Sequence, residues 1–258
     1  MTYPLPNFST DLKGQIALVT GASSGLGRRF AKVLAACGAQ VAVCGRRRDR
    51  LEEVAAEIRA DGGQAAPVTL DVTKTDDLIA AFDQAEKAFG GPVTILVNNA
   101  GMPDAQRAHK MSIEFIDTVF STNLRSPYIL SCEFARRLIA AKKPGRIVNI
   151  ASMAAFTYHG NGAALYSTTK GAVIRMTEAL AVEWAKFDIN VNAIAPGAFS
   201  SEMVDGMLER MGDITKGFPR PRLGDPAQMD STLLFLVSPS SDFVTGAFVK
   251  IDDVQSGR

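Results

Sequence analysis

The 258-residue chain is poor in the residues that build disulfide frameworks and metal sites. It contains three cysteines, Cys37, Cys44 and Cys132, with no C-x-x-C spacing, and two histidines, His109 and His159. An odd, scattered set of thiols with so little imidazole supports neither a disulfide framework nor a zinc site. We therefore expect no bound metal.

The sequence also lacks an excess of either charge and any long apolar run. Its 28 basic and 27 acidic side chains leave a formal net charge of +1, so no overall field would attract nucleic acid or an anionic membrane. There is no 18-residue apolar stretch, and residues 1–13 contain prolines without the apolar centre of a signal peptide. These absences predict a cytoplasmic protein whose partner is a small molecule, with no nucleic acid and no membrane.

What the chain does contain is a regular alternation of short apolar runs and longer stretches of helical period. The apolar runs, which lack polar alternation and so predict strands buried on both faces, lie at 16–20, 40–44, 65–70, 93–97, 146–150, 190–194 and 247–251. The stretches of helical period lie at 26–37, 50–60, 76–89, 112–120, 164–187 and 227–237. The alternation predicts an α/β fold with a doubly wound parallel sheet. We expect one catalytic domain over residues 14–258, preceded by an extension of residues 1–13.

Residues 199–221 interrupt this rhythm, and we call them the substrate flap. The segment is longer than the usual connection in an α/β unit and carries Met203, Met207, Met211 and Phe218. We expect it to be partly helical. Methionine suits a surface that adapts to apolar shapes, but these side chains would equally serve to pack the flap onto the core, and the sequence leaves both interpretations open.

A glycine-rich turn follows the first expected strand and opens the first expected helix. It reads Thr-Gly-Ala-Ser-Ser-Gly-Leu-Gly at positions 20–27. Glycines let the backbone turn tightly and approach a pyrophosphate, which the free N–H groups and positive dipole end of a helix attract. The spacing departs from the common G-x-G-x-x-G, although strand, turn and helix follow in the required order. The residues predicted to contact the cofactor here are Gly21, Ser23, Ser24, Gly25, Leu26 and Gly27.

The end of the second expected strand indicates which dinucleotide is bound. An NAD-selective enzyme would place an acid there to hold the ribose 2′-hydroxyl, whereas this chain has Gly45 followed by Arg46, Arg47 and Arg48. Guanidinium groups bind phosphate bidentately. The pattern therefore favours NADP over NAD, with Arg46 and Arg47 at the 2′-phosphate. Arg46 is the best single candidate because it directly follows the expected acidic position, and the alternative is a solvated basic turn.

Two further acidic positions belong to this region. Asp49 and Glu52 have the spacing of a helix N-cap and its partner, which would put the arginines at a helix N-terminus. Cations there oppose the helix dipole unless an anion joins them. After the third expected strand, Asp71 and Val72 are candidates to flank the adenine.

Tyr166 and Lys170 form a Tyr-x-x-x-Lys pair inside the expected helix 164–187, with Ser152 in the preceding loop. A phenol has a reference pKa of about 10, so it is a poor proton donor near neutral pH unless a fixed cation favours its phenolate. Residues four apart share a helix face, which lets Lys170 supply that cation. Together with the glycine-rich turn, the pair indicates hydride-transfer chemistry.

At this point the chain resembles the short-chain dehydrogenase/reductase family over nearly all of its length after the extension. The motifs that carry the resemblance are T-G-A-S-S-G-L-G at 20–27, N-N-A-G at 98–101, Asn123 in T-N-L, Ser152 in I-A-S, Tyr166 with Lys170, and P-G at 196–197. The resemblance implies a single Rossmann-like domain with strand order 3-2-1-4-5-6-7. It also implies a homotetramer.

The resemblance assigns roles to four residues. Tyr166 would be the general acid/base and Ser152 the hydroxyl that polarises the substrate carbonyl. Lys170 would bind the nicotinamide ribose and lower the pKa of Tyr166, and Asn123 would hold a water through which Lys170 exchanges protons. Three of them have plainer alternatives: Ser152 as a cap at the end of a strand, Asn123 as a hydrogen-bonding residue inside a helix, and Tyr166 as a packed aromatic ring. The other implied cofactor positions are Asn98, Ala100, Gly101, Pro196, Gly197, Phe199 and Ser201. Asn98 and Ala100 could instead stabilise the sheet.

The sequence departs from the family pattern in three places. Ser152 and Tyr166 are 14 residues apart, one more than usual, which suggests an insertion in the loop 154–164. Ser201 stands where threonine is common. Residues 251–254 read Ile-Asp-Asp-Val where such proteins usually carry a glycine pair, which puts the local turn in doubt.

The predicted function is an NADPH-dependent carbonyl reductase, reversible as an alcohol dehydrogenase, acting on a bulky, mostly apolar ketone or a 3-oxoacyl thioester. His159 is expected to be a loop residue rather than a catalytic one. The alternatives are an NAD-dependent, steroid-like alcohol dehydrogenase, an isomerase or dehydratase with tightly held NAD, and a non-catalytic dinucleotide-binding sensor. The candidate substrate residues are Met102, Met153, Tyr158, Met203 and Met207.

Overall fold

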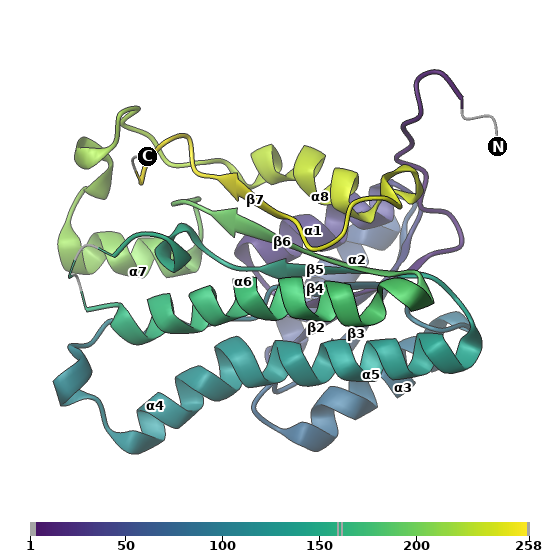
Figure 1. Ribbon diagram of the computed structural model, residues 1–258, viewed down its shortest axis with the longest axis horizontal. Coiled ribbons are helices and arrows are strands. Elements are labelled where there is room, and N and C mark those ends of the chain that lie inside the picture. The colour runs from purple at the N-terminus through teal and green to yellow at the C-terminus, as the bar shows by residue number, and fades with distance from the viewer. Residues whose placement is uncertain (1–3, 159, 161, 257–258) are drawn as a thin grey trace.

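A computed structural model of the chain describes residues 4–158, 160 and 162–256. Seven parallel strands form one sheet in the order β3-β2-β1-β4-β5-β6-β7 (Figure 1). The strands are β1 Ile16–Thr20, β2 Gln40–Gly45, β3 Gln64–Thr69, β4 Ile95–Asn98, β5 Gly145–Ile150, β6 Ile189–Pro196 and β7 Phe248–Ile251. The predicted doubly wound parallel sheet and its strand order are confirmed.

Helices cover both faces of the sheet (Figure 1). One apolar core joins the sheet to α3 Thr75–Phe89, α5 Ser126–Ala141 and α6 Ala164–Trp184. A second core on the opposite face joins it to α1 Gly25–Ala36, α2 Arg48–Ala60 and α8 Asp230–Val237. Because both faces are covered, the central strands β1, β4 and β6 are buried along their whole length.

The edge strands differ from the central ones. β3 is exposed at its first and last residues, and β7 alternates between exposed and half-buried residues, since each strand has a neighbour on one side only. Pro67 lies in β3, where an edge position tolerates a residue without an N–H group. Pro67 is therefore a feature of the sequence that indicates β3 as an edge strand.

Two helix predictions were wrong. The apolar pattern indicates no helix between the expected segments 112–120 and 146–150, yet α5 lies there and follows α4, Ile113–Phe120, through a π-helical turn, Ser121–Arg125. Its buried positions include the polar residues Ser131 and Glu133, and these obscure the apolar period.

The second correction concerns the start of α2. Arg47 is the N-cap and the helix begins at Arg48, so Asp49 lies in the first turn and is not the cap. Glu52 instead accepts hydrogen bonds from the Arg48 side chain at 2.7 and 3.0 Å. The side chain of Arg47 is held by residues outside the helix, described below, and the helix starts two residues earlier than local capping rules predict.

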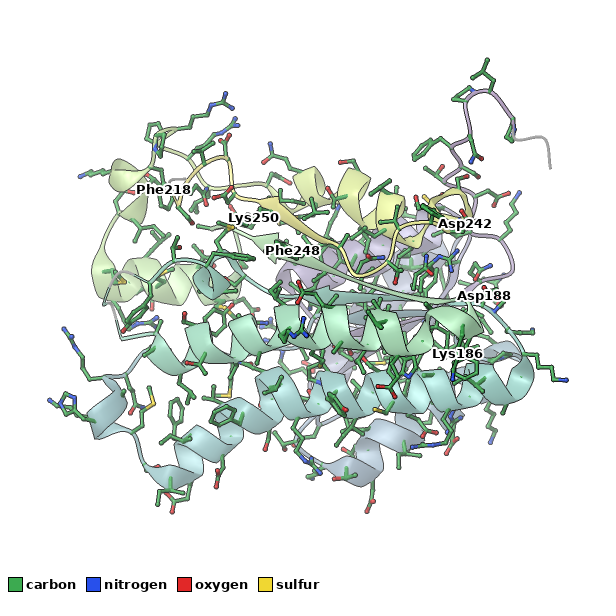
Figure 2. The ribbon with its side chains drawn as sticks, viewed as in Figure 1. Lys186, Asp188, Phe218, Asp242, Phe248 and Lys250 are labelled. Atoms are coloured by element: carbon green, nitrogen blue, oxygen red, sulfur yellow. The ribbon has the colours of Figure 1, made fainter. Side chains whose placement is uncertain are left out.

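The substrate flap lies between β6 and α8. It is partly helical, as expected: α7 spans Glu202–Met211 and a 3-10 turn spans Ile214–Gly217. Figure 2 shows Phe218 of the flap at the carboxyl end of the sheet, opposite Asp188 and Asp242, which precede β6 and β7. The flap therefore covers the sheet edge at which open α/β proteins bind ligands.

Two described segments near the chain ends contact the domain. Leu12, in the predicted extension, is fully buried, and its N–H donates to the carbonyl of Cys37 at 2.8 Å. At the other end, Asp253 and Val254 have φ angles of +47° and +62°. They adopt the left-handed conformation that glycine favours, although neither residue is a glycine. Within the described ranges, no helix is both long and apolar enough to cross a membrane.

Candidate active site

The predicted catalytic residues meet at the carboxyl ends of β4 and β5. Ser152 follows β5, Tyr166 and Lys170 lie in the first two turns of α6, and Asn123 lies in the π-helical turn before α5. Three segments of the chain thus converge on one place. The sheet order explains why, since β4 and β5 are neighbours and their carboxyl ends share an edge.

Tyr166 and Lys170 face each other, as the four-residue spacing predicts. The Lys170 ammonium lies 5.6 Å from the centroid of the Tyr166 ring. It donates a hydrogen bond of 2.7 Å to the carbonyl of Ile150 at the end of β5. Because Lys170 is buried, this bond fixes the cation beside the phenol.

Burial sets the protonation of both groups. Desolvation lowers the pKa of Lys170 to about 8, which brings its proton exchange close to neutral pH. Desolvation also raises the pKa of Tyr166, opposed by a hydrogen bond with the Ser152 side chain and reinforced by the negative charge of Asp104. The protein alone therefore keeps Tyr166 protonated, as a proton donor should be before reaction.

Ser152 has two roles at once. Its Oγ accepts a hydrogen bond from the N–H of Ala154 at 3.1 Å, so it does cap the short helix after β5. The same hydroxyl bonds to Tyr166. The cap fixes the position of Ser152 next to the phenol, so the structural and chemical interpretations are compatible.

The side chain of Asn123 is occupied by protein partners. Its Nδ2 donates to the Met102 carbonyl at 2.9 Å and to Thr169 Oγ1 at 3.3 Å, and its Oδ1 accepts from the Met102 N–H at 2.9 Å. These bonds tie the π-helical turn to the loop after β4. A Cβ on Gly101 would lie 3.5 Å from Asn123 Oδ1 and 3.6 Å from Lys170 Nζ, so this glycine packs directly over both.

Asp104 is a member of the site that sequence reasoning missed. It is buried, and its carboxylate accepts a hydrogen bond of 3.0 Å from the Tyr166 N–H and one of 2.8 Å from the Ala105 N–H. The first of these satisfies a free donor in the first turn of α6. No local pattern marks Asp104, because its partner is 62 residues away.

The glycine-rich turn has the geometry of a phosphate cradle. Gly21 has a φ of +66°, and a Cβ on Gly27 would lie 2.3 Å from the Gly21 carbonyl oxygen. Asn99, a second missed residue, donates from Nδ2 to the carbonyls of Thr20 at 2.9 Å and Gly21 at 3.3 Å. Ser24 is the N-cap of α1, and its side chain leaves the first-turn N–H groups of that helix uncapped. The turn, Leu26 and Gly25 included, therefore presents donors suited to a pyrophosphate.

The predicted 2′-phosphate residues separate into two places. Arg47 donates to Ser23 Oγ at 2.9 Å and to Ser24 Oγ at 3.0 Å, which places it on the glycine-rich turn. Arg46 is exposed and lies near Asp71. Burial acts to raise the pKa of Asp71, but hydrogen bonds from Thr73 and the charge of Arg46 hold it below its usual range.

The remaining cofactor candidates fall into two groups. Val72 is buried beside Asp71, and the N–H of Ala100 donates to Thr20 Oγ1 at 2.9 Å. Asn98 points into the sheet, with Nδ2 donating to Asn149 Oδ1 at 2.8 Å and Ser131 Oγ at 3.1 Å. Its side chain therefore stabilises the sheet, one of the two roles expected for it.

The end of β6 leads directly into the flap. β6 ends at Pro196, and the N–H of Gly197 donates to the Ile251 carbonyl at 2.8 Å. Phe199 is buried, and Ser201 caps α7 by accepting from the Val204 N–H at 3.4 Å. These residues fix the start of α7 against the carboxyl end of the sheet.

The substrate candidates are not equivalent. Met153 is buried in the core under α6, whereas Tyr158 and Met203 are 49% and 39% exposed. Met102 and Met207 are half-buried. His159 lies outside the described residues, as does part of the loop with the suspected insertion. Among the described residues, no cluster of three or more His, Cys, Asp or Glu side chains could hold a metal ion.

Comparison with known proteins agrees with this geometry. The sequence model of the family "short chain dehydrogenase" matches residues 15–211. A 2-dehydro-3-deoxy-D-gluconate 5-dehydrogenase of Formosa agariphila is 35% identical over 249 residues, which cover 94% of this chain and 92% of that protein.

Solved structures show the same fold. A short-chain type dehydrogenase/reductase from Mycobacterium marinum superposes with a TM-score of 0.92 at 34% identity, covering 96% of this chain and 98% of that one. An actinorhodin polyketide ketoreductase with NADPH has a TM-score of 0.89 at 30% identity, covering 95% and 98%. Two independent lines, the Ser152–Tyr166–Lys170 geometry and these similarities, thus agree. The chain belongs to the short-chain dehydrogenase/reductase family and is an oxidoreductase that acts on CH–OH or C=O groups.

Proposed function

We propose that the protein is an NADPH-dependent carbonyl reductase, reversible as an alcohol dehydrogenase. The observation that carries the proposal is the placement of the Tyr166 phenol between the Ser152 hydroxyl and the buried ammonium of Lys170. A phenol held this way can pass a proton to or from a substrate oxygen. A dinucleotide-binding sensor would have no use for it.

Each side chain then has a defined task. NADPH, when bound, supplies the hydride that adds to the carbonyl carbon. Tyr166 donates its proton to the carbonyl oxygen, so negative charge is neutralised as it develops. Ser152 orients that oxygen. Lys170 stabilises the resulting phenolate, and its pKa of about 8 allows it to return a proton. Asn123 is held by Met102 and Thr169, and its part in that relay stays a prediction.

The cofactor assignment rests on the residues that face the expected ribose. Arg47 and Ser23 together offer guanidinium and hydroxyl donors to a 2′-phosphate, and no acid takes the place at Gly45 where NAD recognition would need one. The related ketoreductase structure contains NADPH. NADP is therefore favoured over NAD.

For the substrate, two classes have support. Half-buried and exposed methionines near the site favour a bulky, apolar ketone or a 3-oxoacyl thioester. The name of the Formosa relative instead refers to a sugar acid, and Arg107 and Lys110 are exposed cations in the loop after β4 that could meet a carboxylate. The apolar class agrees better with Met102, Met203 and Met207. A homotetramer in the cytoplasm completes the proposal.

A panel of carbonyl substrates tests the function directly. Purified protein is assayed at 340 nm with NADPH or NADH against aryl and alicyclic ketones, 3-oxoacyl thioesters and keto sugar acids. We expect NADPH oxidation with at least one apolar ketone or thioester and a higher kcat/KM than with NADH. Turnover of keto sugar acids alone would move the substrate class to that of the Formosa relative. No turnover of any carbonyl with either nucleotide would contradict the reductase assignment.

A further inference from the structure

The first residue of α7, Glu202, is bound to the residues assigned to the cofactor. Its Oε2 accepts hydrogen bonds of 3.1 Å from Ser24 Oγ and 3.1 Å from Arg47 Nη2. Its Oε1 accepts from Arg47 Nη1 at 3.4 Å and from the Arg50 guanidinium. A single carboxylate thus ties the substrate flap to the glycine-rich turn and to α2.

The Glu202 carboxylate lies where the chain concentrates positive charge. Arg47 is the N-cap of α2 and Arg50 lies in its first turn, where cations oppose the helix dipole. The pKa of Glu202 lies below its usual range, chiefly because Arg47 donates hydrogen bonds to it, and bonds from Arg50 and Ser24 lower it further. Burial acts in the opposite direction and is weaker than the effect of Arg47. Glu202 is therefore charged at neutral pH and offsets both arginines.

The same N–H groups would serve a phosphate. Arg47 Nη2 lies 2.9 Å from Ser23 Oγ, 3.0 Å from Ser24 Oγ and 3.1 Å from Glu202 Oε2. A phosphate monoester also binds an arginine through paired N–H groups, so it and Glu202 cannot both use this edge of the guanidinium fully. The contact is exchangeable, since Glu202 is 51% exposed and Arg47 is 40% exposed, and exposed ion pairs contribute little to stability.

The flap is close enough for this exchange to affect it. A Cβ on Gly25 of the glycine-rich turn would lie only 3.3 Å from Cβ of Ser201, the residue before Glu202. α7 also carries Met203 and Met207, the substrate candidates of the flap. Loss of the Glu202–Arg47 contact therefore removes one tie between the start of α7 and the residues assigned to the cofactor.

We propose that Glu202 is a latch that competes with the 2′-phosphate of the cofactor for Arg47. Binding of the phosphorylated nucleotide releases the start of α7, so Glu202 sets both the discrimination between NADPH and NADH and the attachment of the flap. The proposal rests on the proposed function, because it requires the 2′-phosphate at Arg47. By thermodynamic linkage, the Glu202–Arg47 contact lowers the affinity for the 2′-phosphate by the same factor by which bound phosphate weakens that contact.

The test compares Glu202→Gln with Glu209→Gln. Glu209 is an exposed acid on the same helix, and the described part of the structure shows no ion pair for it, so the control removes the same charge without touching the arginines. Dissociation constants are measured by nucleotide fluorescence for NADPH and NADH, and by calorimetry for 2′,5′-ADP and 5′-AMP. Glu202→Gln should tighten NADPH and 2′,5′-ADP roughly fivefold, at the low end of typical coupling. NADH, 5′-AMP and the control should change less than twofold.

Limited trypsin digestion reports on the flap itself. Arg210 and Lys216 are exposed flap residues that trypsin recognises. Addition of 2′,5′-ADP to the wild type should speed cleavage there, whereas 5′-AMP should not, and Glu202→Gln should be cleaved fast without nucleotide. Equal cleavage in all these states would contradict release of α7.

Arg47→Ala separates the two ways of failing. If it removes the preference for NADPH while Glu202→Gln leaves NADPH binding unchanged or weaker, the cofactor assignment stands and the latch is wrong, because Glu202 then merely positions Arg47. If the wild type shows no preference and Arg47→Ala changes nothing, the 2′-phosphate is not bound at Arg47. The cofactor assignment and the latch would then both be wrong.

Discussion

At the scale of single residues, the site balances burial against charge. Burial lowers the pKa of Lys170 to about 8 and raises that of Tyr166. The two effects favour the neutral form of each group, and the proximity of the cation to the phenol opposes them. Chemistry at this site therefore depends on small changes in the charge around Tyr166.

Asp104 provides such a change, and Asp104→Asn removes its charge while keeping one of its two hydrogen bonds. The amide oxygen of asparagine can still accept from the Tyr166 N–H, whereas the amide nitrogen cannot accept the second bond, from the Ala105 N–H. The substitution removes a negative charge that disfavours the phenolate. The pKa of Tyr166 should fall, and the limb of the kcat/KM profile that reports Tyr166 should move to lower pH in both reaction directions. Profiles measured in each direction check this, and a limb that stays in place or moves to higher pH would contradict it.

Asp104→Ala is the companion variant. It removes the charge and also the bond to the first turn of α6, which should cost about 1 kcal/mol of unfolding free energy. Denaturant unfolding of the two variants separates these contributions. We expect Asp104→Asn to be the more stable of the two, with the same direction of change in the pH profile.

Sequence reasoning found the residues that follow local rules and missed those that act at a distance. Tyr166 and Lys170 are recognisable because four-residue spacing fixes their relative placement on a helix. Asp104 bonds to Tyr166, which is 62 residues away in sequence. The partners of Asn99 in the glycine-rich turn are 78 and 79 residues away, and those of Glu202 are 152 to 178 residues away. Only the assembled sheet brings such partners together.

At the scale of elements, the apolar runs predicted the first and last residues of the seven strands to within two positions. They are reliable here because parallel strands covered on both faces must be apolar throughout. The period failed for α5, whose buried positions include Ser131 and Glu133. The capping pattern of Asp49 failed at the start of α2, where the tertiary contacts of Arg47 override it.

The turn after β7 shows how an element survives an unfavourable sequence. Val254 has a φ of +62°, a conformation that costs a β-branched residue roughly 1–2 kcal/mol. Nearby, Asp253 accepts hydrogen bonds from Arg220 at 3.0 Å and Arg222 at 2.7 Å. Gln255 bonds to the Ala198 N–H at 2.7 Å. These contacts fasten the chain end to the flap and hold the turn in place.

Val254→Gly should therefore stabilise the protein. Relief of the left-handed strain outweighs the added flexibility of the unfolded chain, for a net gain of about 1 kcal/mol, and the 44% exposed side chain gives up little burial. The matched control is Val182→Gly at an exposed position within α6, which should destabilise by about as much. Urea unfolding curves measure both, and a Val254→Gly protein no more stable than the wild type would show that the turn is unstrained.

At the scale of the whole molecule, the two apolar cores position one functional edge. The sheet ends, the glycine-rich turn, α6 and the substrate flap all meet at the carboxyl end of the strands (Figure 1). Trp184, the last residue of α6, is buried in the core of the single chain. This helix therefore needs no partner subunit to bury its apolar side. The exposed apolar residues Ile113 and Tyr128 on α4 and α5 are the better candidates for subunit contacts in the proposed tetramer.

The measurement that tests the central claim most directly is the turnover of Tyr166→Phe. The variant keeps the aromatic ring against Lys170 and removes only the hydroxyl that transfers the proton. With a ketone that the wild type reduces, we predict a kcat lower by roughly 10²- to 10⁴-fold, with the dissociation constant of NADPH unchanged within about twofold. The exposed Tyr128→Phe serves as the control and should match the wild type. An undiminished kcat in Tyr166→Phe would contradict proton transfer through this phenol and, with it, the proposed mechanism.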